Sequence, residues 1–430
     1  MLRPAQDFAP GVTALPLAER PPLARGRLVA AVVALALGGF AIGTTEFVTM
    51  GLLPDIAEGV GIDIPTAGHV ISFYALGVVV GAPVIAALGT RLPRRALLLG
   101  LMAAFIVGNA LTALAPGYGS LLAARFLAGV PHGAYFGVAS LVAASLVAPH
   151  LRGRAVSSVM LGLAIANVAG VPAATWLGQE FGWRSAYWAV VVIGALTIAA
   201  ISAVVPGAPG NRAATVRSEL GALRRPQVLL TLVVGVVGFG GMFAVYSYVA
   251  PLVTEVTGMS RGTIPWVLFA FGLGGVVGTA LGGRLADLAL FRSLVGTMVA
   301  TGVLLALVPL AARTPVTIVA LIFTVGAAAS ALVVCLQIRL MQVAGEAQML
   351  GAALNHSALN AANALGAWLG GLVIAAGLGY TAPGMVGAGL AALGLVALTA
   401  SAVLRRRELR ALADAHPAPT AAPVEVPAAR

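Results

Sequence analysis

The sequence contains no lysine, only one cysteine and few charged side chains. Charged residues make up 9% of its 430 residues and hydrophobic residues 60%, whereas about a quarter of an ordinary soluble domain is charged. A soluble globular protein is therefore excluded. The single cysteine, Cys335, lies inside an apolar run and excludes an internal disulfide. Because a Walker phosphate loop needs a lysine, ATP is not the expected energy source.

Motifs of catalysis and metal binding are also absent from the sequence. It holds no H-E-x-x-H, no G-x-S-x-G and no cluster of cysteine and histidine. An enzyme would therefore have no recognisable nucleophile or set of metal ligands to build on. We expect a protein that is not an enzyme and that uses neither a metal nor a cofactor.

Long apolar runs take up most of the chain. About 20 consecutive apolar residues are enough to cross a bilayer as a helix. We therefore predict an all-α membrane protein with twelve transmembrane helices, at residues 28–52, 66–89, 96–115, 120–147, 155–178, 185–205, 228–252, 264–285, 293–312, 315–338, 348–374 and 381–404.

The arginines are distributed unevenly between alternate loops. If the apolar runs cross the membrane in turn, 21 of the 25 arginines lie on one side, three on the other, and Arg125 within a run. Positive charge favours the cytoplasmic side, so both termini are predicted to be cytoplasmic. This placement argues against nucleic acid as the reason for the net charge of +11. The preference for arginine, alanine and glycine is typical of a bacterial source, so we expect a multi-pass inner-membrane protein.

A polar interval near the middle of the chain separates two sets of six predicted helices. ALGTRL at 87–92 recurs as ALGGRL at 280–285, and WLG at 176–178 recurs at 368–370, at nearly the same offset. These matches favour two six-helix repeats, an arrangement of many secondary transporters that bind substrate between the halves. The predicted segments are a cytoplasmic leader (1–27), an N-terminal bundle (28–206), a cytoplasmic linker (207–226), a C-terminal bundle (227–404) and a cytoplasmic tail (405–430).

Two charged residues lie within the predicted spans at similar depth. Arg125 is in the fourth run, and Glu46 is the one acid clearly inside a span. A charge in a bilayer-length segment is costly and usually faces a wet cavity or a partner. Burial and a neighbouring guanidinium act on the protonation of a carboxyl in opposite senses, so Glu46 could exchange protons near neutrality. We predict that the two residues meet and carry proton coupling or contact substrate; the alternative is a purely structural pair.

Five further polar or helix-bending residues lie within the spans. His132 lies two turns beyond Arg125, and histidine titrates near neutrality, so a relay role is open beside a packing role. In the fifth run Asn167 precedes Pro172, which lets a helix bend and could form a hinge. Asn360 and Asn363 stand three apart on one helix face and could line a cavity or bond a neighbouring helix.

Three stretches resemble one known family. They are GTTEFVTMGLLPDIA in the first run, RFLAGVPHGAYFG in the fourth and NHSALNAANALGAWLGG in the eleventh. Residues 28–404 resemble the major facilitator superfamily, and within it the twelve-helix drug:proton antiporters of the branch that holds arabinose-efflux-like permeases and chloramphenicol resistance proteins. The resemblance implies the major facilitator fold, an exporting antiporter, and a proton-coupling role for Arg125.

The same resemblance implies a gating loop between the second and third runs. Arg91, Arg94 and Arg95 match the basic residues of the family's motif, whereas Thr90 stands where its aspartate belongs. In the second half the stretch GRLAD ends at Asp287. We expect these arginines and Asp287 to take part in gating.

The leading interpretation is proton-driven export of a small, largely apolar drug by alternating access, with chloramphenicol or a related phenicol as the most specific expectation. Sugar (arabinose-like) or metabolite efflux is the alternative. An uptake symporter and a non-transporting receptor or scaffold are further ones, although a scaffold has no need of a buried Glu46 and Arg125. The expected partners are the drug, protons and the lipid bilayer, with no nucleic acid, and we expect a monomer driven by the proton gradient.

Overall fold

The computed structural model describes residues 24–89, 92–148, 151–207, 225–344 and 348–415. Regular structure within these ranges is helical throughout. Most of the predicted leader, linker and tail lies outside the described residues, as does Arg91 of the predicted gating loop.

The helices fall into two consecutive groups, which we call the N-half and the C-half. The N-half comprises α1 (Arg25–Gly51), α2 (Leu53–Val60), α3 (Ile64–Gly89), α4 (Arg94–Leu114), α5 (Tyr118–Gly129), α6 (His132–Ser145), α7 (Arg152–Ile165), η2 (Ala166–Gly170), α8 (Val171–Phe181) and α9 (Trp183–Val204). The C-half comprises α11 (Pro226–Val233), η4 (Val234–Gly238), α12 (Phe239–Tyr246), α13 (Val249–Pro251), η5 (Leu252–Val256), η6 (Arg261–Thr263), α14 (Ile264–Ala306), α15 (Val308–Ala311), α16 (Pro315–Ala344), α17 (Gln348–Val373), η7 (Ile374–Leu378) and α18 (Ala382–Ala415).

Twelve membrane crossings follow from these helices. Within the described residues, 11 helical segments are long and apolar enough to cross a bilayer, and one of them covers 46 residues, Arg261–Ala306. That segment reverses direction at Ala289, whose φ and ψ are −163° and 79°. Ser293 Oγ donates to the Leu285 carbonyl at 2.6 Å, although residues eight apart in a straight helix are separated by about 12 Å. The segment therefore crosses twice, and the predicted all-α membrane protein with twelve crossings is confirmed.

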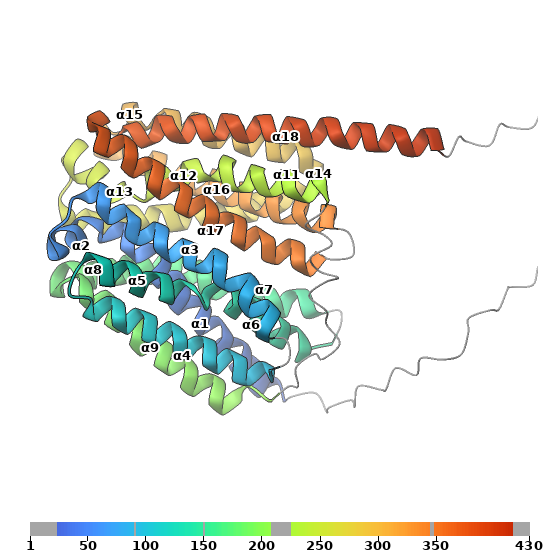
Figure 1. Cartoon of the computed structure of the whole chain (residues 1–430), viewed down its shortest axis with the longest axis horizontal. Coiled ribbons are helices and arrows are strands. Elements are labelled where there is room, and N and C mark those ends of the chain that lie inside the picture. The colour runs from blue at the N-terminus through green and yellow to red at the C-terminus, as the bar shows by residue number, and fades with distance from the viewer. Residues whose placement is uncertain (1–23, 90–91, 149–150, 208–224, 345–347, 416–430) are drawn as a thin grey trace, which may run out of the picture.

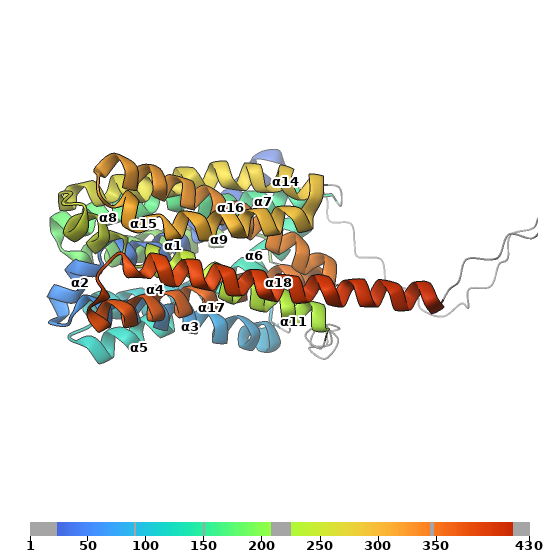
Figure 2. The ribbon, with the colours of Figure 1, turned by 90° about the horizontal axis from the view of Figure 1, so that it is seen from above.

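The crossings lie side by side as a bundle with two distinguishable ends (Figures 1 and 2). The first residues of α1 and α11 and the end of α18 lie at one end, which we call the terminal face. The short helix α2 lies at the other end, the opposite face. An even number of crossings requires this placement of the two chain ends.

Several predicted crossings are not continuous α-helix, and two of them bear on the candidate site. In the fourth, a turn at Val130 and Pro131 separates α5 from α6, although both residues keep helical dihedral angles. The fifth changes from α-helix to the π-helical η2 directly before Pro172 in the first turn of α8. Proline lacks a backbone donor, and π-helical turns commonly mark functional positions. Both interruptions lie beside buried polar residues.

Glycine allows α3 and α5 to approach closely. A Cβ on Gly129 would lie 2.1 Å from the Tyr74 carbonyl oxygen, so no larger residue fits there. Small residues at such crossings are the usual means by which membrane helices pack closely. The contact fixes Tyr74 of α3 beside the helix that carries Arg125.

The end of the tenth crossing differs from the sequence prediction, and the difference changes the position of Arg339. The tenth run was expected to end at residue 338, which would leave Arg339 in a cytoplasmic loop. Helix α16 continues to Ala344, and Arg339 is only 4% exposed. The prediction of a loop position for Arg339 is therefore wrong, because an arginine ends a hydropathy run without ending the helix.

Candidate functional site

Arg125 is completely buried and held by neighbouring helices. Its Nη1 donates to Thr45 Oγ1 at 3.2 Å and its Nη2 to the Thr45 carbonyl at 3.3 Å. The guanidinium carbon lies 4.2 Å from the centre of the Tyr74 ring and 5.4 Å from that of Tyr187. A cation over an aromatic face is stabilised by the ring quadrupole, more strongly when it is desolvated. These contacts fix the guanidinium in one position.

Thr45 connects this guanidinium to a third helix. While its Oγ1 accepts from Arg125, it donates to Asn109 Oδ1 at 2.5 Å. Asn109 Nδ2 in turn donates to the Phe105 carbonyl at 2.8 Å. The side chains of this series are buried and hydrogen-bonded to one another, as a medium of low dielectric requires, although Arg125 Nε has no partner among the described residues. The series gives α1 and α4 a defined register around Arg125.

Glu46 lies next to Thr45 in sequence and faces a histidine. Its side chain is buried, and Glu46 Oε2 is 4.0 Å from His132 Nε2. His132 Nδ1 shares a hydrogen bond of 3.0 Å with the Tyr74 hydroxyl. We call Glu46, Arg125, His132 and Tyr74 the polar cluster. Tyr74 joins its two parts, with its ring under the guanidinium and its hydroxyl on the imidazole.

The predicted meeting of Glu46 and Arg125 is therefore indirect. Among the described residues, the ion pairs within 4.0 Å are His132 with Glu46 and Arg261 with Asp55. Arg125 binds the residue before Glu46 and still acts on the carboxylate through its charge. The structure thus brings the three predicted coupling residues into one cluster, with His132 rather than Arg125 nearest the carboxyl.

Four aromatic residues lie at the contact between the halves, and one of them, Phe47, follows Glu46 in the sequence. Phe47 of α1 stacks on Phe243 of α12 with ring centres 6.4 Å apart, and meets Tyr246 edge-on at 6.1 Å. Tyr246 stacks on Phe271 of α14 at 3.9 Å. We call these four residues the aromatic cluster. Its ring faces offer flat apolar surface, and Phe47 is the sequence neighbour of the buried Glu46.

The space beside the aromatic cluster is nearly closed. An apolar cavity lined in part by Tyr246 and Phe271 has a volume of about 10 Å³, which is about the room that one water molecule needs. A drug-sized molecule requires several hundred Å³. All residues that line this cavity belong to the C-half, and the cavity is too small for such a molecule in this structure.

At the opposite face an ion pair joins the halves. Arg261 Nη2 of η6 lies 3.0 Å from Asp55 Oδ1 of α2, and the Arg261 carbonyl accepts from Gln179 Nε2 at 3.0 Å. Burial raises the pKa of Asp55 above its usual value, and the charge of Arg261 opposes that rise. We call the pair of Asp55 and Arg261 the opposite-face ion pair.

The predicted hinge lies where the halves touch within the membrane. Asn167 belongs to η2 and Pro172 to the first turn of α8. Asn167 Nδ2 donates to the Leu163 carbonyl at 3.1 Å, and its Oδ1 is without a partner in the described part of the chain. A Cβ on Gly272 of α14 would lie 2.4 Å from the Asn167 carbonyl. The irregular segment of the fifth crossing therefore packs directly on the C-half.

The amides of α17 are buried with few partners. Asn360 Nδ2 donates to the His356 carbonyl at 3.1 Å, whereas neither amide atom of Asn363 has a partner within the described ranges. The His356 ring stacks on Phe136 of α6 with centres 5.8 Å apart. Ser72 of α3 donates to the Ala364 carbonyl at 3.1 Å. These residues lie where α17 meets the N-half.

Among the described members of the predicted gating set, Arg94, Arg95 and Asp287, no hydrogen bond or ion pair joins one to another. Arg94 and Arg95 begin α4, and Arg95 Nη2 donates to the Ser202 carbonyl of α9. Asp287 is exposed on α14, and no described residue forms an ion pair with it within 4.0 Å. Arg95 therefore makes its described contact inside the N-half.

Sequence reasoning missed Thr45, Tyr74, Asn109 and Phe47. Thr45 and Phe47 flank Glu46 in sequence, which is a signal that could have been used. A single tyrosine or asparagine inside an apolar run carries no such signal, because belts and helix contacts explain it equally well. These positions become apparent only once α1, α3, α4 and α5 are packed together.

Comparison with known proteins agrees with this architecture. A family model described as Major Facilitator Superfamily matches residues 35–287 and 241–427. The inner membrane transport protein YdhP of Escherichia coli K12 is 43% identical over 370 residues, covering 86% of this chain and 95% of that protein. The putative transporter AraJ of the same organism is 36% identical over 352 residues, covering 81% and 89%.

A third relative is the chloramphenicol resistance protein of Streptomyces lividans, 36% identical over 356 residues and covering 81% of this chain and 88% of that protein. The branch predicted from three sequence stretches is thereby confirmed. The apolar helices and these relatives make the chain a multi-pass protein of the bacterial inner membrane. With a family model matched over most of its length and relatives at this identity, the chain belongs to the major facilitator superfamily.

Proposed function

We propose that this transporter exports a small, largely apolar drug in exchange for protons, by alternating access. The observation that carries the proposal is the polar cluster: a buried carboxyl, Glu46, lies 4.0 Å from His132 beside a guanidinium that is fixed by other contacts. Acids within membrane spans are rare and usually mark a proton or substrate pathway.

The cluster can exist in two states that differ by one proton. With the proton bound, Glu46 is neutral and suits its buried position. With the proton lost, the carboxylate is stabilised by the charge of Arg125. When the opposite face is open, protonation of Glu46 releases the drug, and when the terminal face is open, loss of the proton favours its capture. The driving force is the proton gradient, with no cofactor.

The aromatic cluster supports the choice of substrate class. Phe47 and Phe243 present ring faces across the halves, so a compound with an aromatic ring and small polar substituents fits this surface better than a sugar. The similarity to a protein named for chloramphenicol resistance makes a phenicol the most specific expectation.

A resistance panel tests the proposed substrate. The chain is expressed in a drug-sensitive host, and growth is compared in phenicols, cationic dyes and arabinose. The proposal expects protection against phenicols that is abolished when the proton gradient is dissipated. Protection against arabinose toxicity alone would favour the sugar-efflux alternative and contradict the drug assignment.

Orientation belongs to the same proposal. We place the terminal face, and with it both chain ends, in the cytoplasm, because most arginines lie on that side. Tags at both termini and in the linker should then be reachable only from the cytoplasm. An external linker tag would contradict this orientation. Nothing in the proposed exchange requires a second subunit, and we expect a monomer.

A further inference from the structure

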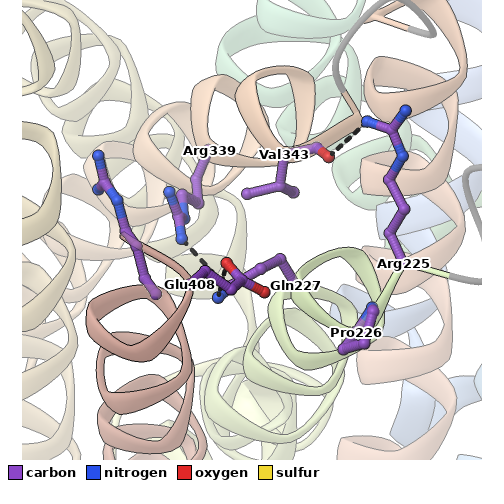
Figure 3. A pocket seen from close by; sticks show the side chains of 7 residues that line it. Arg225, Pro226, Gln227, Arg339, Val343 and Glu408 are labelled. Carbon is purple, nitrogen blue, oxygen red and sulfur yellow. Dashed lines mark hydrogen bonds between the residues drawn. The ribbon is translucent and has the colours of Figure 1, made fainter. Parts of the chain in front are cut away.

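A second polar site lies at the terminal face of the C-half, away from the polar cluster. A cavity of about 340 Å³ opens between the beginning of α11, the end of α16 and the continuation of α18. Figure 3 shows side chains from these three helices directed around one opening. The polar side chains that line it are Arg225, Gln227, Arg339, Arg405 and Glu408.

Arg339 is the most unusual member of this pocket. It is 4% exposed, and its Nη2 donates to Gln227 Oε1 at 3.2 Å. Its Nε has no partner among the described residues, and no described acid lies within 4.0 Å of it. Removing an arginine from water costs several kcal/mol unless an opposite charge compensates. Glu408 lines the same cavity and acts on Arg339 only through its charge, without a direct ion pair, so the buried guanidinium is suited to an anion that enters the cavity.

The other charges of the pocket leave it positive. Arg225 Nη1 is directed to the Val343 and Ala344 carbonyls at 3.5 and 3.1 Å, where it caps the end of α16. Glu408 Oε2 accepts from Gln227 Nε2 at 3.3 Å. Arg405 also lines the cavity, so three guanidinium groups face one carboxylate.

The backbone adds to this field. Helix α11 begins at Pro226, which is on the pocket wall, and the start of a helix carries partial positive charge. Helix starts therefore favour anions, phosphate groups in particular. This effect alone would not define a site, but it acts in the same direction as the buried Arg339.

We propose that this pocket binds a phosphate group, and that the phosphate is the headgroup of an anionic phospholipid. A volume of about 340 Å³ is at the lower end of the range for small-molecule sites, which suits a phosphate with a small polar substituent such as glycerol. Arg405, Arg406 and Arg407 follow one another on α18, and this helix extends beyond the bundle at the terminal face (Figure 1). Basic residues beside a crossing attract anionic lipids. Free phosphate shares the chemistry but gains nothing from the adjacent bilayer.

The test uses the purified full-length protein in a neutral detergent. Its unfolding temperature is measured with added phosphatidylglycerol, phosphatidylethanolamine, glycerol 3-phosphate or inorganic phosphate. Phosphatidylglycerol should raise the unfolding temperature in a concentration-dependent manner, and the zwitterionic lipid should not. A rise with the two soluble phosphates that equals the rise with phosphatidylglycerol would keep the site but overturn the lipid as its occupant.

Two variants of equal charge separate the pocket from general surface attraction. Arg405→Gln removes a lining guanidinium, whereas Arg406→Gln removes an exposed neighbour that does not line the cavity. Because a charge-assisted hydrogen bond is lost, Arg405→Gln should weaken phosphatidylglycerol binding about tenfold. Arg406→Gln should leave it within about twofold.

Arg339→Gln should abolish the response, provided that it still folds, which its unfolding temperature without lipid reports. If it does not fold, Arg405→Gln alone decides. Equal weakening in Arg405→Gln and Arg406→Gln, or no response of the wild type to any of the four additives, would overturn the proposal.

Discussion

Replacing Glu46 by glutamine tests the proposed proton site most directly. Glutamine keeps the size of the side chain and removes its titration. The contacts that hold Arg125 come from Thr45, Tyr74 and Tyr187, so they are retained. Because the 4.0 Å approach to His132 is longer than a hydrogen bond, the free energy of unfolding should change by no more than about 1 kcal/mol, the value of one hydrogen bond.

The effect on transport should be far larger than the effect on stability. Moving one proton charge through 100 mV supplies about 2.3 kcal/mol, which sustains a gradient of a neutral drug of roughly 50-fold. A variant that cannot exchange this proton should sustain no gradient in vesicles energised in this way. Ligand binding should persist, because the aromatic cluster is unchanged.

The assay is proton release on drug binding, measured with a pH-sensitive dye on purified protein in weak buffer. Wild-type protein should release protons, and Glu46→Gln should release none. Glu58→Gln, which removes an exposed acid from α2, is the matched control and should behave as wild type. If Glu46→Gln releases as many protons as wild type, the reasoning fails and His132 becomes the candidate proton site.

Three further changes test other parts of the structure. Tyr74→Phe keeps the ring under the guanidinium but removes the hydroxyl that is hydrogen-bonded to the imidazole. The pH midpoint of proton release should therefore shift, while drug affinity stays within about threefold. An unchanged midpoint would show that the hydroxyl has no part in coupling. Because the pKa of Asp55 is raised, acidification of the opposite face should neutralise Asp55 at a higher pH than an ordinary aspartate and break the opposite-face ion pair. Spectroscopic distances between α2 and η6 can follow this change. Asp55→Asn and Arg261→Gln should each remove the pH dependence, and its persistence in both variants would exclude this ion pair as its cause. Replacing Arg94 and Arg95 by alanine should lower resistance with near-normal membrane insertion, measured by plating and by immunoblotting of membranes, and full resistance would reduce this loop to a topology signal.

Composition predicted the crossings because the physical rule behind it is simple. A helix must supply about 20 apolar residues to span the hydrocarbon, whatever it packs against. The two short helices α2 and η6 obey no such rule, so the opposite-face ion pair between them was not foreseen. Asp55 and Arg261 are 206 residues apart in sequence, and only the packing of the halves shows that they meet.

Depth in the membrane was also predictable, whereas direction around a helix was not. Counting residues placed Glu46 and Arg125 at one level, and they do belong to one cluster. Each residue turns the side chain by about 100° around the helix, so a shift of one position decides which of two neighbours meets the guanidinium. Arg125 binds Thr45, and Glu46 is left to face His132.

For Arg339 the sequence predicted the side of the membrane but not the surroundings. Its charge was assigned to a loop, whereas the residue is buried in α16. As one of many arginines on one side it contributed to the orientation argument, and that argument is unaffected by whether the residue lies in a loop or at the end of a helix. Its buried position depends on α16 continuing to Ala344 and on α11 and α18 closing around it. The same arginine can therefore help to orient the chain during insertion and, once the bundle has formed, present a positive charge without a direct ion-pair partner among the described residues to a cavity. The first role requires only that it stay on one side of the membrane, and the second requires the packed structure.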